Sequence, residues 1–395
     1  MKRFVYADNA ATTPVNPEVL AAMVPCFGNA FGNPSSLHEK GREAKALLDD
    51  ARSRIARVLG CDASEIYFTS SGTEADNWAI RGAAMRMREK HGRTHIVTSK
   101  IEHHAVLHTC EALEREGFSV TYVGVDEYGV VNLDELREAV TDNTAVVAIM
   151  YANNEVGTIE PVREMCEIAH AKGALMFTDA VQAFGSVEID LSTLKVDMLS
   201  ISGHKIGAPK GIGMLFVRRG VVIKNLIEGG GQERRKRGGT ENLPYIVGLA
   251  RAVELAKERM DELPRVAKMR DRLIEELTKI PYSRLNGHRT NALPGTVNIG
   301  FEFIEGESLL LWLDIAGICA STGSACSSAS LDPSHVLIAM GVPHEKAHGS
   351  LRISISKDTT DEEIDYIIEN VPPIVERLRN MSPLWEDVVK STVSK

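Results

Sequence analysis

One lysine of this sequence stands where covalent chemistry is favoured. Lys205 follows the apolar run 196–201 and a Ser-Gly-His triplet, and the glycine-rich run 207–213 comes directly after it. Short apolar runs bounded by glycines are typical of buried strands, so we expect Lys205 on a loop that leaves a strand. A lysine partly removed from water has a lowered pKa, and its amine can form a Schiff base with a carbonyl group. A surface lysine beside a flexible glycine turn is the plain alternative.

An aspartate stands at the end of another apolar run. Asp179 directly follows the apolar run 174–178, and Gln182 comes three positions later. Burial disfavours an ionised carboxyl group unless a cation lies nearby. The protonated ring nitrogen of pyridoxal phosphate (PLP) is such a cation, and the aldehyde of PLP is a natural partner for Lys205. A helix N-cap is the competing explanation for Asp179.

A turn of small residues follows the predicted strand 65–69. Ser71, Gly72 and Thr73 begin a helical pattern that runs to about residue 88. Free backbone N–H groups and the helix dipole at such a start favour a phosphate, and the two hydroxyls can add hydrogen bonds. A plain N-cap would explain the same residues. Neither a Walker loop nor a G-x-G-x-x-G turn after a strand occurs, so nucleotide binding has little support.

Histidines gather after the predicted strand 95–99. His104 and His108 are four positions apart, a spacing that can place two imidazoles on one side of a helix, as in zinc sites. The metalloprotease pattern needs a glutamate after the first histidine, but Ala105 stands there. Ligands of α/β proteins bind at the carboxyl ends of strands, so a histidine here is better explained as lining a cofactor pocket. We therefore predict no metal site.

A cysteine and an arginine are the candidates for contact with a substrate. Cys326 lies in the run 320–330 of mostly small residues, so we expect an exposed, mobile thiol whose thiolate is free to attack. An incidental loop cysteine is the alternative. Arg352 begins an apolar strand where an unpaired guanidinium would be costly to bury, and it suits a bidentate contact with a carboxylate.

The elements that must position these residues alternate between strands and helices. Strands are predicted at 65–69, 95–99, 119–125, 145–151, 174–178, 196–201 and 213–217, with helical patterns between most of them. This order predicts a doubly wound α/β sheet, in which strand ends converge on one edge. That edge would bring Lys205, Asp179, Gln182, Asn154 and the turn 71–73 together.

After residue 240 the regular alternation of strands and helices gives way to longer helical patterns and a smaller α/β unit. Helices are predicted at 244–280 with a break at Pro264, at 308–316 and at 361–381, and strands at 296–301 and 351–356. We expect Pro372 and Pro373 to interrupt the last helix. We predict a large domain of residues 15–261 and a small domain of residues 1–14 and 262–395 that carries the Cys326 loop.

Composition argues against several function classes. The 395 residues carry a net charge of -9, which does not favour a nucleic-acid surface. The chain shows neither a signal peptide at its start nor an apolar run of the roughly 18 residues that a membrane span needs. Six cysteines without a C-x-x-C pair are too sparse for a disulfide framework. We expect a cytoplasmic protein without nucleic-acid or membrane partners.

Segments spread over nearly the whole chain carry a family resemblance. They are Tyr6-Ala-Asp-Asn-Ala-Ala-Thr-Thr, Gly32-Asn-Pro-Ser-Ser-Leu-His, Ser71-Gly-Thr-Glu, Asn153-Asn-Glu, Thr178-Asp-Ala-Val-Gln, Ser202-Gly-His-Lys, Arg237-Gly-Gly-Thr-Glu-Asn and Ser324-Ala-Cys-Ser-Ser. Together they resemble fold-type I PLP enzymes of the class V aminotransferase family, and within it the cysteine desulfurases of the NifS/IscS group. The resemblance implies a mostly parallel seven-stranded sheet flanked by helices, a smaller α/β C-terminal domain, and a homodimer.

The resemblance also implies a role for each candidate residue. Lys205 would carry PLP, and His103 would stack on the ring, whereas His104 fills a variable place in the family pattern. Asp179 would pair with the ring nitrogen and Gln182 with the ring hydroxyl. Further implied cofactor contacts are Gly72, Thr73, Asn154, Ser202 and His204, together with Thr240, which would reach the phosphate in the neighbouring subunit.

The implied reaction converts L-cysteine to L-alanine. Arg352 and Asn154 would bind the substrate carboxylate, and Cys326 would take the sulfur as a persulfide and pass it to an iron–sulfur scaffold or another acceptor protein. Another PLP-dependent lyase or an aminotransferase, such as a selenocysteine lyase, would share Lys205 and Asp179. A non-catalytic binding module would be expected to have lost such residues.

Overall fold

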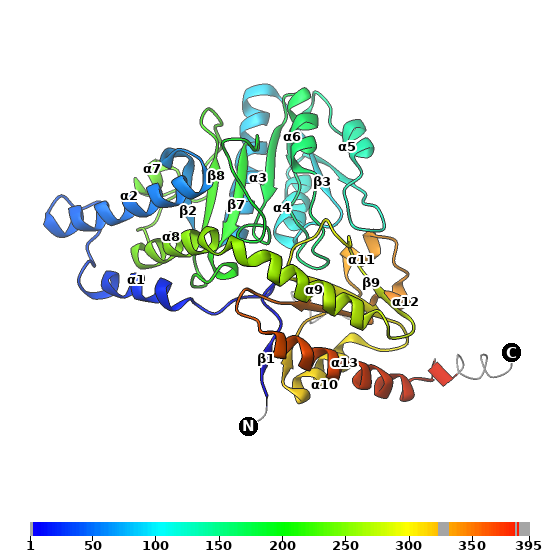
Figure 1. Ribbon diagram of the computed structural model, residues 1–395. Coiled ribbons are helices and arrows are strands. Elements are labelled where there is room, and N and C mark those ends of the chain that lie inside the picture. The colour runs from blue at the N-terminus through cyan, green and yellow to red at the C-terminus, as the bar shows by residue number, and fades with distance from the viewer. Residues whose placement is uncertain (1–2, 323–331, 384, 387–395) are drawn as a thin grey trace.

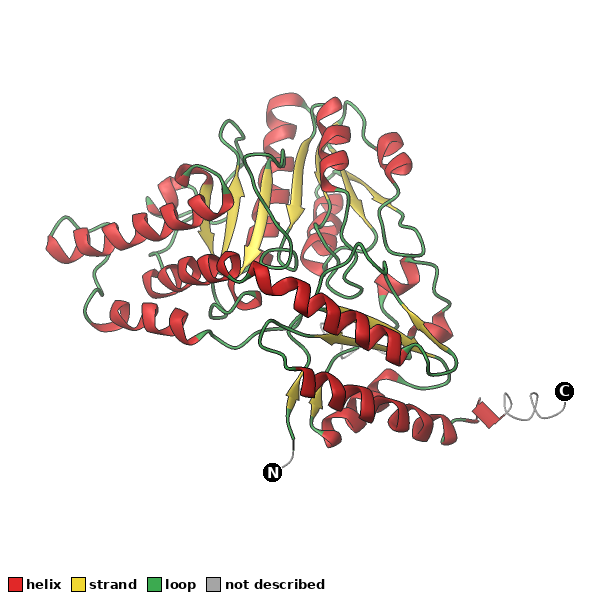
Figure 2. Cartoon of the chain, in the orientation of Figure 1, coloured by secondary structure: helices red, strands yellow, loops and turns green. Residues whose placement is uncertain are grey.

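A seven-stranded sheet forms the main body of the chain (Figures 1 and 2). The computed structural model describes residues 3–322, 332–383, 385 and 386. Cys326 lies outside the described residues. The spatial order of the strands is β2 (Ile66–Thr69), β8 (Gly213–Val217), β7 (Met198–Ser202), β6 (Leu175–Asp179), β5 (Thr144–Ala148), β3 (His95–Ser99) and β4 (Ser119–Val123). β8 alone runs opposite to the other six strands, so the prediction of a mostly parallel seven-stranded sheet is confirmed.

Helices cover both faces of this sheet, as parallel strands require. They are α1 (Pro17–Gly28), α2 (Glu39–Leu59), α3 (Gly72–His91), α4 (His104–Arg115), α5 (Leu133–Ala139), α6 (Val162–Ala171), the short α7 (Gln232–Arg235) and α8 (Leu243–Glu258). Strand side chains alternate between the faces: Leu199 and Ile201 of β7 pack under α2, whereas Met198 packs on the α3 side.

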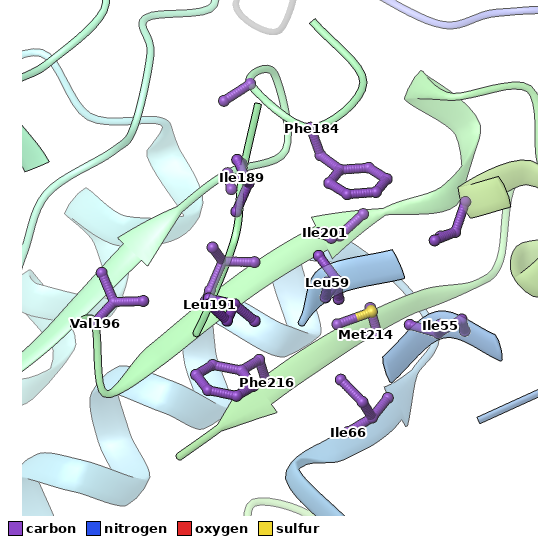
Figure 3. Packing of buried hydrophobic residues seen from close by; sticks show 14 of the residues in the cluster. Ile55, Leu59, Ile66, Phe184, Ile189, Leu191, Val196, Ile201, Met214 and Phe216 are labelled. Atoms are coloured by element: carbon purple, nitrogen blue, oxygen red, sulfur yellow. The ribbon is translucent and has the colours of Figure 1, made fainter. Parts of the chain in front are cut away.

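The packing under α2 shows why these segments fold as they do. Ile55 and Leu59 recur at the four-residue spacing of one helix face and contact the sheet beside Ile201 and Met214 (Figure 3). All four side chains are fully buried, and each contributes about 1.5–3 kcal/mol through the hydrophobic effect. Gly60 ends the helix in a left-handed conformation with φ of 70°.

A smaller α/β unit follows, with its own apolar core. Its strands are β9 (Ser283–Leu285), β10 (Thr296–Phe301) and β12 (Ser350–Ser354) in an antiparallel sheet, and β11 (Ile318–Cys319) beside β1 (Val5–Tyr6). Its helices are α9 (Leu263–Leu277), α10 (Gly306–Ala316), α11 (His335–Ala339), α12 (His344–Ala347) and α13 (Asp361–Asn380). Figure 1 places β1 beside α10 and α13, so the N-terminal strand belongs to this C-terminal unit. The domain boundaries remain a prediction.

The expected interruption of the last helix is wrong. α13 continues through Pro372 and Pro373 without a break. Two prolines remove helix hydrogen bonds, but Val371 and Val375 on either side are fully buried in the apolar core. Packing of that face therefore outweighs the local cost. None of the described helices is both long enough and apolar enough to cross a bilayer.

Candidate active site

Most candidate residues meet in one cavity of about 420 Å³. Its wall includes Gly72, Thr73, His103, Asn154, Asp179, Gln182, Ser202, His204, Lys205 and Arg352. The cavity lies at the carboxyl ends of β2, β3, β5, β6 and β7, because β2 and β7 both run antiparallel to β8. The expected convergence of strand ends is therefore what the structure shows. Thr240 is exposed and is not among the described residues of this wall, and Cys326 lies outside the described residues.

Lys205 ends a short 3-10 turn, Gly203–Lys205, directly after β7. Its Nζ donates to the carbonyl oxygens of Ala10 and Ala11, at 2.5 and 2.9 Å. Gly203 lets this turn pack closely against Ile212, because a Cβ there would lie 2.8 Å from the Ile212 side chain. The amine is thus held in the cavity by the N-terminal segment of the chain.

Asp179 is the last residue of β6 and is 6% exposed. It accepts a hydrogen bond from the Val181 N–H at 2.8 Å. Burial raises the pKa of Asp179 to about 6, although the Lys205 charge opposes the shift. Gln182 on the following turn donates through Nε2 to the Ala10 oxygen at 3.0 Å. A cation entering the cavity would be attracted to Asp179 and would restore its ionised form.

The turn before α3 packs closely against neighbouring loop and strand residues and leaves its backbone N–H groups near the cavity. Ser71 caps the helix by accepting from the Glu74 N–H at 3.1 Å. Gly72 allows the turn to press on the sheet, because a Cβ there would lie 2.8 Å from Val181 and 3.2 Å from Ser202. The Thr73 side chain is exposed toward the cavity. Backbone N–H groups of this helix start can therefore reach an anion.

Two histidines that line the cavity, His103 and His204, are neutral at pH 7. Burial, followed by the Lys205 charge, lowers the pKa of His103 to about 4 and that of His204 to about 4. His103 caps α4 by accepting the Ala105 N–H on Nδ1 at 3.1 Å, which leaves Nε2 as the protonated nitrogen of the neutral ring. His204 Nδ1 lies 3.1 Å from the Thr12 hydroxyl. Among the described residues, no three His, Cys, Asp or Glu side chains are grouped as a metal site requires.

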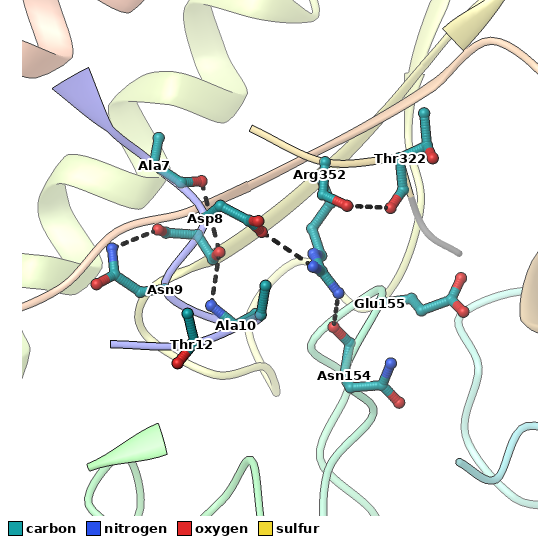
Figure 4. Close-up of polar contacts among 12 residues, drawn as sticks. Ala7, Asp8, Asn9, Ala10, Thr12, Asn154, Glu155, Thr322 and Arg352 are labelled. Carbon is teal, nitrogen blue, oxygen red and sulfur yellow. Dashed lines mark hydrogen bonds and ion pairs between the residues drawn. The ribbon is translucent and has the colours of Figure 1, made fainter. Parts of the chain in front are cut away.

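Arg352 enters the cavity from β12 and is 3% exposed (Figure 4). Its Nη2 contacts Asp8 Oδ1 at 3.0 Å, and its Nη1 donates to the Asn154 carbonyl oxygen at 3.0 Å. The buried Nε has no hydrogen-bond partner among the described residues. The guanidinium thus faces the cavity with its charge partly compensated by a carboxylate from the N-terminal segment.

Sequence reasoning missed several residues of this wall. Asp8, which does not line the cavity itself, contacts the wall residue Arg352 from 344 positions away, and nothing in the sequence indicated this pair. Asp76, in the first turns of α3, and His335, the first residue of α11, also line the cavity. A carboxyl group four residues after the Gly72 turn was the available signal for Asp76.

Comparisons with known proteins agree with this geometry. The family profile described as Aminotransferase class-V matches residues 5–367. The chain is 57% identical to "Cysteine desulfurase IscS" of Methanosarcina thermophila over 381 residues, which is 96% of this chain and 94% of that protein. A solved NifS-like protein superposes with a TM-score of 0.90 at 41% identity, covering 95% of this chain and all of that one. "SspA in complex with cysteine" has a TM-score of 0.79 at 36% identity, over 90% of this chain and all of the other. The chain therefore belongs to the aminotransferase class-V family, among its cysteine desulfurases.

Proposed function

We propose that the protein uses PLP to convert L-cysteine to L-alanine and takes the sulfur on Cys326 as a persulfide. The observation that carries this proposal is the convergence of Lys205, Asp179, His103 and Arg352 in one cavity of a chain that groups with cysteine desulfurases. The related SspA has been solved in complex with cysteine, which supports cysteine as the substrate.

The residues of the cavity fit PLP. The helix start at Gly72 and Thr73, with the neutral His204 and Ser202, offers hydrogen-bond donors to a phosphate. Asp179 is a buried carboxyl group whose pKa stays raised because the Lys205 charge only partly offsets burial. A protonated ring nitrogen would supply the positive charge that stabilises its ionised form. Gln182 would meet the ring hydroxyl, His103 would stack on the ring, and Asn154 would contact its edge.

The side chains of the cavity divide the work of the reaction. PLP, when bound, supplies the carbonyl for a Schiff base and an electron-withdrawing ring. Arg352 and Asn154 bind the α-carboxylate and orient the substrate. The Lys205 amine takes the proton from the substrate Cα, and the neutral His103 exchanges a proton near the sulfur.

Sulfur transfer forms one bond and breaks another. The Cys326 thiolate attacks the substrate sulfur, so that a sulfur–sulfur bond forms while the carbon–sulfur bond breaks. The electron pair of the broken bond stays on the substrate carbon, which takes up a proton and becomes the methyl group of alanine. The persulfide sulfur then passes to an acceptor protein, for which we propose an iron–sulfur scaffold.

We also propose that the protein works as a homodimer in the cytoplasm. Leu20, Val24 and Phe27 form an apolar stripe on α1 and are 52%, 57% and 60% exposed, which favours burial against a second copy. Thr240 is exposed in the glycine loop, from which it could reach the partner's cofactor. None of the described cysteines is joined in a disulfide bond, as a reducing compartment favours.

A direct test records the visible spectrum of the purified protein and measures alanine formed from L-cysteine, for the wild type and Cys326→Ala. We expect both proteins to show the absorbance of PLP bound to Lys205, and only the wild type to release alanine repeatedly. Equal turnover in both would contradict the role of Cys326 and point to another PLP-dependent lyase or an aminotransferase.

A further inference from the structure

A second carboxyl group lies in the cavity beside Asp179. Asp76 of α3 lines the same wall and is 1% exposed. Buried carboxyl groups are normally paired with a cation or fully hydrogen-bonded. Oδ1 of Asp76 has no hydrogen-bond partner among the described residues. The roles proposed above leave this buried acid without a function.

The groups that act on Asp76 come from three neighbouring strands and are acids or a hydroxyl. Asp179 at the end of β6 and the buried Glu102, after β3, both disfavour a negative charge on Asp76. Ser200 of β7 has no partner in hydrogen-bonding geometry among the described residues, yet it lies close enough to lower the pKa of both Asp76 and Asp179. Ser200 is therefore a shared neighbour of the two carboxyl groups.

The surroundings of the two carboxyl groups differ in one respect. Burial, and then the charge of Asp179, raises the pKa of Asp76 well above its ordinary value. Burial raises the pKa of Asp179 only to about 6, because the Val181 N–H and the Lys205 charge oppose the shift. Two interacting buried carboxyl groups lose their protons in separate steps. As the pH rises, Asp179 loses its proton before Asp76, because the Lys205 charge acts on Asp179.

We propose that Asp76 is a positioning residue that keeps its proton at neutral pH and leaves Asp179 as the single anion opposite the ring nitrogen of the cofactor. The protonated Asp76 offers one O–H donor, and in the proposed arrangement this donor serves the Asp179 carboxylate and fixes its orientation. The proposal rests on the proposed function only in taking PLP as the occupant. The position of the proton is a property of this chain alone.

Infrared spectroscopy at pH 7 tests the position of the proton. A protonated carboxyl group has a carbonyl stretch separate from that of a carboxylate, and we expect Asp76→Asn to remove one such band from both the apoprotein and the PLP-loaded protein. Glu160→Gln is the matched control, because Glu160 is also buried, its pKa is raised to about 8, and it is outside the described cavity wall. Glu160→Gln should remove the separate band of Glu160, which shows that a single buried carboxyl group can be detected. If Asp76→Asn keeps every carbonyl band of the wild type, the proposal is overturned.

The absorbance of bound PLP tests the positioning role. Asn resembles a protonated Asp, so Asp76→Asn should keep the pH midpoint of the cofactor absorbance, whereas a midpoint moved by about one pH unit or more would show that Asp76 is charged. Asp76→Ala lacks the donor, and we expect its affinity for PLP to fall about tenfold, the size of one lost hydrogen bond. Equal affinities of the Asn and Ala variants would overturn the role. If the wild type binds PLP but forms no alanine, the proposed function fails while both readouts still decide the role of Asp76.

Discussion

Replacing Arg352 by lysine tests how the substrate is held. In the structure, Arg352 Nη2 contacts Asp8 and Nη1 donates to the Asn154 oxygen, each at 3.0 Å. Lysine keeps the positive charge but loses the planar fork that binds a carboxylate through two parallel bonds. The loss of one charge-assisted hydrogen bond costs about 1.5–3 kcal/mol, which corresponds to roughly a 10- to 150-fold lower kcat/KM for L-cysteine. We expect the loss mainly as a higher KM.

The assay measures initial rates of alanine release against L-cysteine concentration. Arg52→Lys is the matched control, because Arg52 is also buried and also bidentate, contacting the Glu233 carboxylate at 2.6 and 2.9 Å, but is outside the described cavity wall. The control should lower the unfolding temperature and leave the KM unchanged. An unchanged KM in Arg352→Lys, or an equal rise in both variants, would refute the assignment of the carboxylate site.

Three further predictions follow from single residues. Gly72→Ala should weaken PLP binding at least tenfold, because its Cβ would lie 2.8 Å from Val181, whereas Gly28→Ala, with open space around it, should bind PLP as the wild type does; fluorescence titration with PLP measures both. Glu160 has a folded pKa of about 8, above its ordinary value of about 4.3, so its protonated form stabilises the fold and that stability is lost as the pH rises from about 4 through 8. Glu160→Gln should therefore gain melting temperature relative to the wild type between pH 5 and pH 8, and a constant difference would contradict the raised pKa. Lys205→Ala should still bind PLP but without the absorbance of a Schiff base, and its alanine release should be below detection.

Regular elements with a clear apolar pattern could be predicted from the sequence. The bounds of β3, β8 and β10 are those expected, because each is a short apolar run with turn residues at its ends. The predicted strand 145–151 was too long, since β5 ends at Ala148 where the chain turns into the cavity. α13 was predicted with an interruption, because local proline chemistry is visible in sequence while the packing of Val371 and Val375 is not.

The cavity was predictable where a residue follows a strand, because parallel topology itself brings strand ends together. Lys205, Asp179 and the turn at Gly72 all belong to this class. Contacts between distant segments were not predictable: Asp8 meets Arg352, and the Ala10 carbonyl meets Lys205, only after the N-terminal segment folds back across the cavity. Asp76 was missed because a carboxyl group near the start of a helix has an ordinary explanation in the helix dipole.

The most direct test of the central claim is to locate the transferred sulfur. The wild type is incubated with L-cysteine and its thiols are alkylated, and peptide mass spectrometry reads the added sulfur at each cysteine, with Lys205→Ala treated in the same way. We predict one extra sulfur on Cys326 in the wild type and none in Lys205→Ala. Sulfur on another cysteine, or on Cys326 in both proteins, would contradict the account.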